Sequence, residues 1–373
     1  DVVSHGLFAA LSVLVVACPC VVGLATPVAL AAGLNKAARN HILIRDTSAL
    51  EQMRNVDVVV FDKTGTLTEG HPTVIGWLWA QGQEEHYKDV LLAAESTSDH
   101  PLAEAIVTAL EGEEQVIPAH LDGFESIAGK GVRVAYQGAE YWVGSHKLLK
   151  DYQANLSDIL ADMLTQYESD GNSIVYFGRE NDLLAVIAIK DQLRVTSMEA
   201  IRELRIQDIE ICMLTGDGER TASSVAGSLG IMRFVADAMP DDKEDFIHKL
   251  QLQGKTVAMV GDGVNDARAL SCADVSIAMG KGTDTLMDTA MITLRTSDLL
   301  LLPKVFRLSR QTVSLMYRNL FWAFIYNTVG IFVAAGVLYP VYDILLSPAL
   351  AGAAMALSCV SVALSSLRLS SRF

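Results

Sequence analysis

The sequence predicts an α/β protein that combines a parallel-sheet domain, a smaller inserted α+β domain and three transmembrane helices. Long stretches near both ends of the 373-residue chain lack Asp, Glu, Lys and Arg. The polar middle instead repeats a pattern of short β-type runs, polar turns and helical stretches. Over residues 73–188 this rhythm is replaced by helix and strand candidates of a different order, which indicates an insertion after the first strand.

The uncharged stretches contain 34, 24 and 24 residues. A membrane-spanning helix needs about 20 apolar residues. The three predicted spans are therefore 6–30, 319–338 and 347–367. Buried core helices are the alternative, but three such runs would exceed the usual helix length of a globular domain.

Lys and Arg are concentrated at 36–45, 304–318 and 368–372, whereas the loop at 339–347 has neither. Because positive charge favours the cytoplasmic side, the polar middle and the C-terminus are expected in the cytosol. We therefore expect a multi-pass protein of the cell (inner) membrane, with the lipid bilayer as a partner. No signal peptide is visible. The chain begins with Asp close to a span, so we expect an N-terminal part to be missing.

Composition excludes several classes of protein. Hydrophobic residues make up 51% and charged residues 20%, which excludes disorder for most of the chain. The net charge of −15 argues against a nucleic-acid partner. The five cysteines are too few and scattered for a disulfide framework, and Cys212 and Cys272 are expected to serve packing.

The polar middle is expected to divide into domains at changes in this pattern. The predicted boundaries are 1–35 for the first transmembrane segment, 36–72 and 189–300 for the two parts of the parallel-sheet domain, 73–188 for the insert, and 301–373 for two transmembrane helices and a tail. Runs ending at Phe61, Leu214 and Val260 each lead into an Asp- or Gly-rich turn. The carboxyl ends of parallel strands meet at one edge, where such sheets bind ligands.

The turn after the first run contains the most specific motif, Asp62-Lys63-Thr64-Gly65-Thr66-Leu67-Thr68. A carboxylate at a strand end can attack a γ-phosphorus, provided that a cation and a Lys offset the phosphate charge. The seven residues resemble the phosphorylation motif of the P-type ATPases, cation pumps that form an aspartyl-phosphate. The resemblance implies a haloacid-dehalogenase-like phosphorylation domain with ATP as substrate, Asp62 as nucleophile, and Lys63 and Thr64 in the catalytic set. Related phosphatases commonly have a general acid/base Asp where Thr64 stands, so its absence favours a persistent phosphoenzyme.

The Gly-Asp-Gly-Val-Asn-Asp turn at 261–266 matches the family's magnesium loop. Two acidic groups four residues apart can converge on a hard cation. By this resemblance Asp62, Asp262, Asp266 and the Thr64 carbonyl hold Mg²⁺, and Asn265 belongs to the catalytic set. A solvated acidic turn is the alternative. The family's phosphate-handling residues correspond to Thr215, Gly216, Asp217 and Lys243.

In the insert, Glu95 and His100 followed by Pro101-Leu102 resemble the nucleotide-binding signature of the heavy-metal subfamily. There the His, the Glu and a Gly-x-Gly loop surround the adenine, and Gly129 and Gly131 supply that loop here. Gly144 and Ser145 stand where the family often has Gly-Asn. The hydroxyl of Ser145 can donate a hydrogen bond, but its side chain is shorter than that of Asn.

The first span contains Cys18-Pro19-Cys20. Pro removes a helical hydrogen bond and opens the backbone. Two thiolates beside that break form a soft site that favours Cu(I), Ag(I), Zn(II) or Cd(II) over Na⁺ or Ca²⁺. Small buried cysteines are the plainer alternative.

The later spans resemble those of the copper(I)-transporting branch, through Tyr326-Asn327 and the Met355-x-x-Ser358 pattern. Cys359 replaces the Ser expected after Ser358, and it is either a third sulfur ligand or an inert small residue. The resemblance implies ATP-driven translocation of Cu(I), as export from the cytosol, with the ion delivered by a copper chaperone or thiol carrier.

Three alternatives stay open. The first is a pump for Zn(II) or Cd(II), although such pumps usually carry an acidic residue in the final span. The second is a membrane-tethered phosphatase. The third is a metal- and ATP-binding fragment that does not turn over, because no Thr-Gly-Glu actuator loop occurs in the chain. The actuator half of the pump is therefore an expected partner, and phosphorylation without full turnover is the expected activity of this chain alone.

Overall fold

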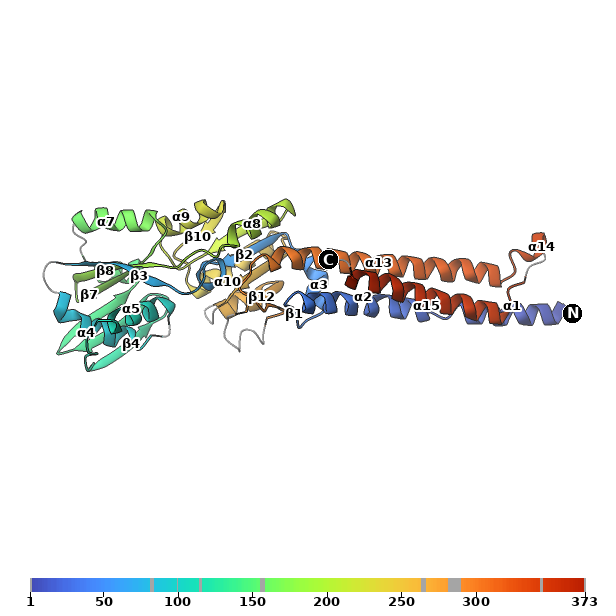
Figure 1. Ribbon diagram of the computed structural model, residues 1–373, viewed down its shortest axis with the longest axis horizontal. Helices are drawn as coiled ribbons and strands as arrows, with labels where there is room; N and C mark the ends of the chain where they lie inside the picture. The colour runs from blue at the N-terminus through green and yellow to red at the C-terminus, as the bar shows by residue number, and fades with distance from the viewer. Residues whose placement is uncertain are drawn as a thin grey trace. The chain divides into compact units, whose positions relative to one another are not determined.

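The computed structural model describes residues 2–371 apart from 81–83, 99, 114–115, 155–157, 263–265, 281–289 and 343–344. The chain divides into two compact units (Figure 1). Unit 1 comprises Asp1–Asn55 and Leu301–Phe373, and unit 2 comprises Val56–Leu300.

Unit 1 is built mainly of helices. Its elements are α1 (Val2–Val16), α2 (Cys20–Arg39), β1 (Ile42–Ile44), α3 (Ser48–Met53), α13 (Leu301–Ala334), α14 (Tyr339–Tyr342) and α15 (Pro348–Ser371). The long helices α2, α13 and α15 lie side by side (Figure 1). Small residues allow this close approach, since a Cβ on Gly33 of α2 would lie 2.6 Å from Thr312 Oγ1 of α13. Cys18 and Pro19 separate α1 from α2, as the helix-breaking effect of Pro predicts.

Two helical segments, His5–Arg39 and Pro348–Leu369, are long and apolar enough to cross a membrane. The prediction of a third span at 319–338 is wrong among the described residues. The helix α13 ends at Ala334, only sixteen residues after Arg318, and its apolar part is interrupted by Asn327. Large apolar side chains nevertheless face outward from α13, among them Phe321, Phe324 and Phe332.

Unit 2 contains a parallel sheet with the strand order β13-β12-β11-β2-β9-β10. The strands are β2 (Val58–Asp62), β9 (Glu210–Leu214), β10 (Arg233–Val235), β11 (Val257–Gly261), β12 (Val275–Met279) and β13 (Ile292–Leu294). Its helices are α8 (Ser197–Ile206), α9 (Glu219–Leu229), α10 (Pro240–Leu252) and α11 (Ala267–Cys272). The central strand β2 is buried at every residue, because neighbouring strands flank it and helices cover the sheet. The predicted parallel sheet is confirmed.

The second sheet of unit 2 is antiparallel, with the order β3-β8-β7-β6-β5-β4. Its strands are β3 (Thr73–Trp79), β4 (Gly123–Ile127), β5 (Gly131–Tyr136), β6 (Ala139–Gly144), β7 (Ser173–Arg179) and β8 (Asp182–Lys190). The helices α4 (Glu84–Glu95) and α5 (Pro101–Glu111) pack on one face, and α7 (Asp158–Ser169) packs on the other (Figure 1). The short helix α6 (His146–Asp151) packs on the same face as α7. This sheet enters between β2 and β9 in the sequence, so its first and last strands return to the loop that follows Asp62.

Candidate active site

Three neighbouring strands of the parallel sheet end at the same edge. Asp62 is the last residue of β2, and it pairs in register with Leu214, the last residue of β9. On the other side, Phe61 pairs with Val260 near the end of β11. The turns that follow these strands therefore bring Asp62, Thr215 and Asp262 to one edge.

Lys243 bridges two carboxylates at this edge. Its Nζ lies 2.5 Å from Asp62 Oδ1 and 2.7 Å from Asp266 Oδ1, and all three side chains are buried. Burial alone would lower the pKa of Lys243, but Asp62 and Asp266 raise it above its ordinary value. The helix α10 thus delivers a permanent positive charge to the carboxylate at the end of β2.

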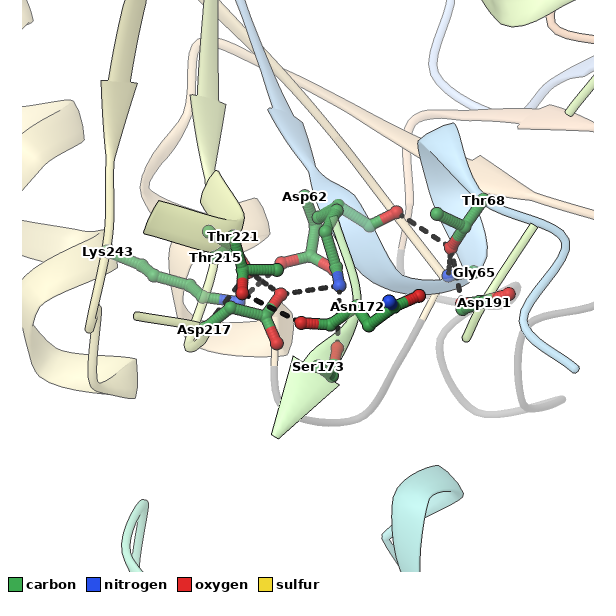
Figure 2. Close-up of polar contacts among 11 residues, drawn as sticks. Asp62, Gly65, Thr68, Asn172, Ser173, Asp191, Thr215, Asp217, Thr221 and Lys243 are labelled. Carbon is green, nitrogen blue, oxygen red and sulfur yellow. Dashed lines mark hydrogen bonds and ion pairs between the residues drawn. The ribbon is translucent and has the colours of Figure 1, made fainter. Parts of the chain in front are cut away.

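A second buried cation, Lys63, is held by the turn after β9. Its Nζ lies 2.5 Å from Asp217 Oδ2 and donates to Ser173 Oγ at 3.1 Å. Both of these partners are labelled in Figure 2. Thr215 Oγ1 donates to Asp217 Oδ2 at 2.7 Å. Burial alone would raise the pKa of Asp217, but Lys63 and these hydrogen bonds lower it. Gly216 lies in the turn between Thr215 and Asp217.

Three carboxylates converge without enough positive charge to balance them. Ligand oxygens of Asp62, Asp262 and Asp266 lie within 4.8 Å of one another. Burial, followed by repulsion from Asp62, raises the pKa of both Asp262 and Asp266 to about 7. A convergent set of hard oxygen donors whose charges repel fits Mg²⁺. Thr64 lies in the adjoining turn, whereas Asn265 lies outside the described residues.

Gly65 allows the loop formed by the motif at residues 62–68, called the phosphorylation loop below, to pass close to Asp262. Its φ is +72°, and a Cβ at this position would lie 1.6 Å from Asp262 Oδ2. Both the left-handed backbone and the close approach therefore require Gly.

The segment after β8 holds the same loop, a feature that the sequence reasoning missed. Thr68 Oγ1 lies 2.5 Å from Asp191 Oδ2, and Arg194 donates to the carbonyls of Gly65 and Thr66. Ser173, the first residue of β7, was also missed. These residues are far from Asp62 in sequence, and only the return of β8 toward the loop signals their proximity.

Two of the predicted nucleotide-binding residues lie at helix ends, Glu95 at the end of α4 and His100 at the start of α5. Glu95 ends α4 and is buried, and burial raises its pKa to about 7. His100 caps α5, where its Nδ1 accepts from the Leu102 N–H at 3.2 Å. The His100 side chain is exposed to solvent on one side, and burial of the rest of the ring lowers its pKa. The negative charges of Asp217 and Asp62 oppose this shift. His100 therefore lies within electrostatic range of the phosphorylation loop.

The predicted glycine loop connects β4 to β5. A Cβ on Gly131 would lie 2.1 Å from the Val143 carbonyl, and one on Gly144 would lie 2.1 Å from the Lys130 carbonyl, so both glycines allow β5 and β6 to approach. Gly129 has φ +68°, and a Cβ there would lie 3.0 Å from Met239 Cε at the start of α10. Ser145 Oγ is buried without a hydrogen-bond partner among the described residues.

The predicted metal ligands of unit 1 lie on α2, α13, α15 and the break before α2. Cys18 and Cys20 flank Pro19 and are joined as a disulfide, so a pair of thiolates requires its reduction. Cys359 packs against a cluster of Val21, Ala25, Ala323 and Val362, which places it on the α2 side of α15. Ser358 is buried, and its Oγ has no hydrogen-bond partner among the described residues. Tyr326 is 43% exposed, and Asn327 and Met355 are half-buried.

The sequence of the chain was compared with the sequence profiles of known protein families. The sequence profile of the haloacid dehalogenase-like hydrolases matches residues 56–274, more than half of the chain. The chain belongs to this family. Its strand β2, Asp62 and the magnesium-type carboxylates all lie within the matched range. The haloacid-dehalogenase-like fold that the motif implied is thereby confirmed.

Curated relatives extend the similarity to unit 1. The chain is 43% identical to a copper-exporting P-type ATPase of Legionella pneumophila over 98% of the chain and 50% of the relative. It is 44% identical to a silver exporting P-type ATPase of Salmonella typhimurium, over 99% of the chain and 44% of the relative. The chain thus spans about half the length of the curated relatives it matches.

Solved structures agree. A zinc-transporting PIB-type ATPase in the E2.Pi state aligns with a TM-score of 0.66 at 34% identity, covering 95% of this chain and 56% of that one. The catalytic domain of the CPx-ATPase CopB-B aligns with a TM-score of 0.60 at 28% identity, and the alignment covers 73% of this chain and 96% of that domain. Unit 2 therefore resembles the catalytic domain of heavy-metal P-type ATPases, and the resemblance indicated by the sequence motifs is confirmed.

Proposed function

We propose that the chain carries the phosphorylation chemistry and part of the ion pathway of a pump that exports Cu(I) across a membrane. The observation that carries this proposal is the buried Asp62 carboxylate, held between Lys243 and the convergent pair Asp262 and Asp266. ATP is the proposed phosphate donor. Full turnover is proposed for the whole protein, whose curated relatives are about twice as long.

The nucleophile is prepared by its neighbours. Lys243 binds one carboxylate oxygen of Asp62 and fixes its position, so the other oxygen is free to attack the γ-phosphorus of ATP. An Oδ–P bond forms while the bond from the γ-phosphorus to the β-phosphate oxygen breaks, and ADP leaves with that electron pair. Lys63, oriented by Asp217, offsets negative charge on the transferred group.

Asp62, Asp262 and Asp266, with the Thr64 carbonyl, would hold Mg²⁺. The bound cation would offset the charge of the carboxylates and phosphate oxygens. Thr64 stands two residues after the nucleophile, where a hydroxyl is a poor general base at neutral pH, and this supports a phosphoenzyme that persists.

The inserted domain already contacts the edge of the sheet where phosphate would be transferred. Lys147 Nζ donates to the Asp237 carbonyl at 2.5 Å, and Gly129 approaches Met239. Glu95, His100, Gly129 and Gly131 are the proposed adenine-binding residues, with Gly144 and Ser145 beside them. A nucleotide bound there would direct its phosphates toward Asp62.

Soft-metal chemistry supports Cu(I) as the transported ion. Reduced Cys18 and Cys20, with Met355 and Cys359, offer sulfur ligands of the kind that Cu(I) prefers. Tyr326, Asn327 and Ser358 are proposed to complete the pathway. The copper and silver exporters among the relatives support this choice. A thiol carrier would deliver the ion from the cytosol, and the bilayer would surround α2 and α15.

The zinc-transporting structure makes Zn(II) the second candidate. The test is phosphoenzyme formation from γ-labelled ATP by the membrane-embedded, reduced chain, with Cu(I), Ag(I) or Zn(II) added. We expect Cu(I) and Ag(I) to stimulate labelling, and Cys18→Ser with Cys20→Ser to remove that stimulation. Stimulation by Zn(II) alone would contradict the copper assignment. Rapid hydrolysis of small phosphate esters would instead favour a phosphatase, and ATP binding without labelling would favour an inactive fragment.

A further inference from the structure

A cluster of three different metal-binding side chains lies outside the phosphorylation site, on α10 and α11. It consists of Glu244, His248 and Cys272, whose ligand atoms all lie within 4.8 Å of one another. Glu244 Oε1 is 3.5 Å from Cys272 Sγ and 3.8 Å from His248 Nε2. These separations are close to those between the ligands of a tetrahedral Zn(II) site.

The positions of the three residues follow from helix geometry. Glu244 and His248 are four residues apart on α10, so they share one face of that helix. Cys272 is the last residue of α11, which packs against α10. The two helices therefore present an acid, an imidazole and a thiol to the same point.

The Gln251 side chain contacts both the His248 ring and the backbone of Cys272. Its Oε1 lies 3.2 Å from His248 Nδ1, and its Nε2 donates to the Cys272 carbonyl at 2.9 Å. A proton on Nδ1 would satisfy the first contact and leave Nε2 free to bind a metal. A single side chain thus orients one candidate ligand and anchors the backbone of another.

The cluster is also accessible. The His248 side chain is 52% exposed, and Cys272 and Glu244 are half-buried. Arg268 Nε lies 3.5 Å from Glu244 Oε2, which leaves Oε1 facing the thiol and the imidazole. Among the described residues, the side chains that converge at the magnesium-type site are the carboxylates of Asp62, Asp262 and Asp266.

We propose that Glu244 Oε1, His248 Nε2 and Cys272 Sγ form a Zn(II)-binding site on the surface of the phosphorylation domain, with a water as the fourth ligand. One thiolate, one imidazole and one carboxylate suit a borderline ion, and the carboxylate disfavours Cu(I). Binding releases the thiol proton to solvent. The packing role expected for Cys272 is thereby extended to ligation, and the site does not depend on the proposed transport function.

An occupied site would connect two helices that serve the phosphorylation centre. Glu244 directly follows Lys243, and α11 begins directly after Asp266. A bond from each helix to one metal ion would restrain the Lys243–Asp266 ion pair, which spans 2.7 Å. Zn(II) at this surface would therefore stiffen the catalytic edge of the sheet.

The test measures alkylation of Cys272 itself. The full chain in detergent is treated with a maleimide at pH 8, with Zn(II), with Mg²⁺ or with neither, and the Cys272 peptide is quantified by mass spectrometry. We expect Zn(II) to slow labelling of Cys272 at least about tenfold and Mg²⁺ to leave it unchanged. The peptide readout separates Cys272 from the cysteines of unit 1.

Variants decide whether the protection is local. His248→Ala and Glu244→Gln should remove most of the protection of Cys272 by Zn(II). The control variant His120→Ala changes an exposed histidine outside the cluster and should retain the protection. As a second readout, Co(II) should give a thiolate-to-cobalt charge-transfer band in wild type, and this band should be lost in Cys272→Ser. Unchanged protection in His248→Ala, or no Zn(II)-dependent change in either readout, would overturn the proposal.

Discussion

Lys63 Nζ donates a hydrogen bond to Ser173 Oγ at 3.1 Å, and both side chains are buried. Lys63 belongs to the phosphorylation loop, whereas Ser173 begins a strand of the antiparallel sheet, 110 residues later. The neighbouring Asn172 carbonyl accepts from Thr221 Oγ1 at 2.7 Å, which fixes this strand end to α9. The insert thus contributes a buried hydrogen-bond partner of Lys63 to the site.

Ser173→Ala is expected to slow phosphoenzyme formation by about 10- to 100-fold, since a hydrogen bond to a charged group contributes about 1.5–3 kcal/mol. The measurement is the initial rate of acid-stable labelling at saturating ATP. Ser228→Ala, which removes a hydroxyl bonded only to its own helix, should leave the rate unchanged. A purely structural role for Ser173 would lower thermal stability without changing the rate per folded molecule.

Gly65→Ala is expected to reduce phosphorylation about 100-fold or more, because a Cβ would overlap Asp262 and displace the loop by a significant fraction of an ångström. Labelling at increasing Mg²⁺ concentration tests this, and high Mg²⁺ should not restore the rate. Gly218→Ala is the matched control, since its φ is −65° and no atom lies within 4 Å of an added Cβ. Equal activity of the two variants would contradict the close approach.

Glu95 provides a prediction of pH dependence. Its pKa is about 7 in the folded chain and about 4.5 when unfolded, so the folded state binds the extra proton. Stability is therefore lost as the pH rises from about 4.5 to 7, by about 3 kcal/mol in all. Glu95→Gln should remove this pH-dependent loss of stability. The difference in free energy of unfolding between the variant and wild type should therefore grow in favour of the variant up to about pH 7 and stay constant above that pH. Thermal unfolding at pH 5, 6, 7 and 8 measures the difference, and a constant difference would contradict the assignment.

Lys243→Met should destabilise the catalytic unit by about 3–5 kcal/mol, because it leaves buried carboxylates without their cation. Mg²⁺ should recover more stability in this variant than in wild type, since the cation would replace the lost charge. Lys249→Met, at an exposed position of the same helix, is the control. Thermal unfolding with and without Mg²⁺ gives both results, and a similar small loss in the two variants would argue against a structural ion pair.

The sheet and its catalytic edge could be predicted because their signals are local. Each strand is a short apolar run, and each turn places Asp or Gly directly after it, as Asp62 and Asp262 illustrate. Phosphorylation-loop contacts made by Ser173 and Arg194 could not be predicted, because they depend on how the insert returns to the loop. The surface cluster at Cys272 depends equally on the packing of two helices.

The failed third span has a different cause. An absence of charge between Arg318 and Asp343 indicated a span, but helix length also depends on where the backbone stops being helical. The helix α13 ends at Ala334, and Gly336, with φ +90°, follows in a turn. Conversely, the break at Pro19 was predictable from a single residue, because Pro acts on the backbone directly.

In the proposed reaction, Asp62 accepts the γ-phosphate of ATP. The most direct measurement is acid-quenched labelling of the membrane-embedded chain with γ-labelled ATP and Mg²⁺, followed by peptide mapping and treatment with hydroxylamine. We expect hydroxylamine-sensitive label on the peptide that contains Asp62, and none in Asp62→Asn. Label on any other residue, or label that persists in Asp62→Asn, would contradict the role of Asp62 as the nucleophile.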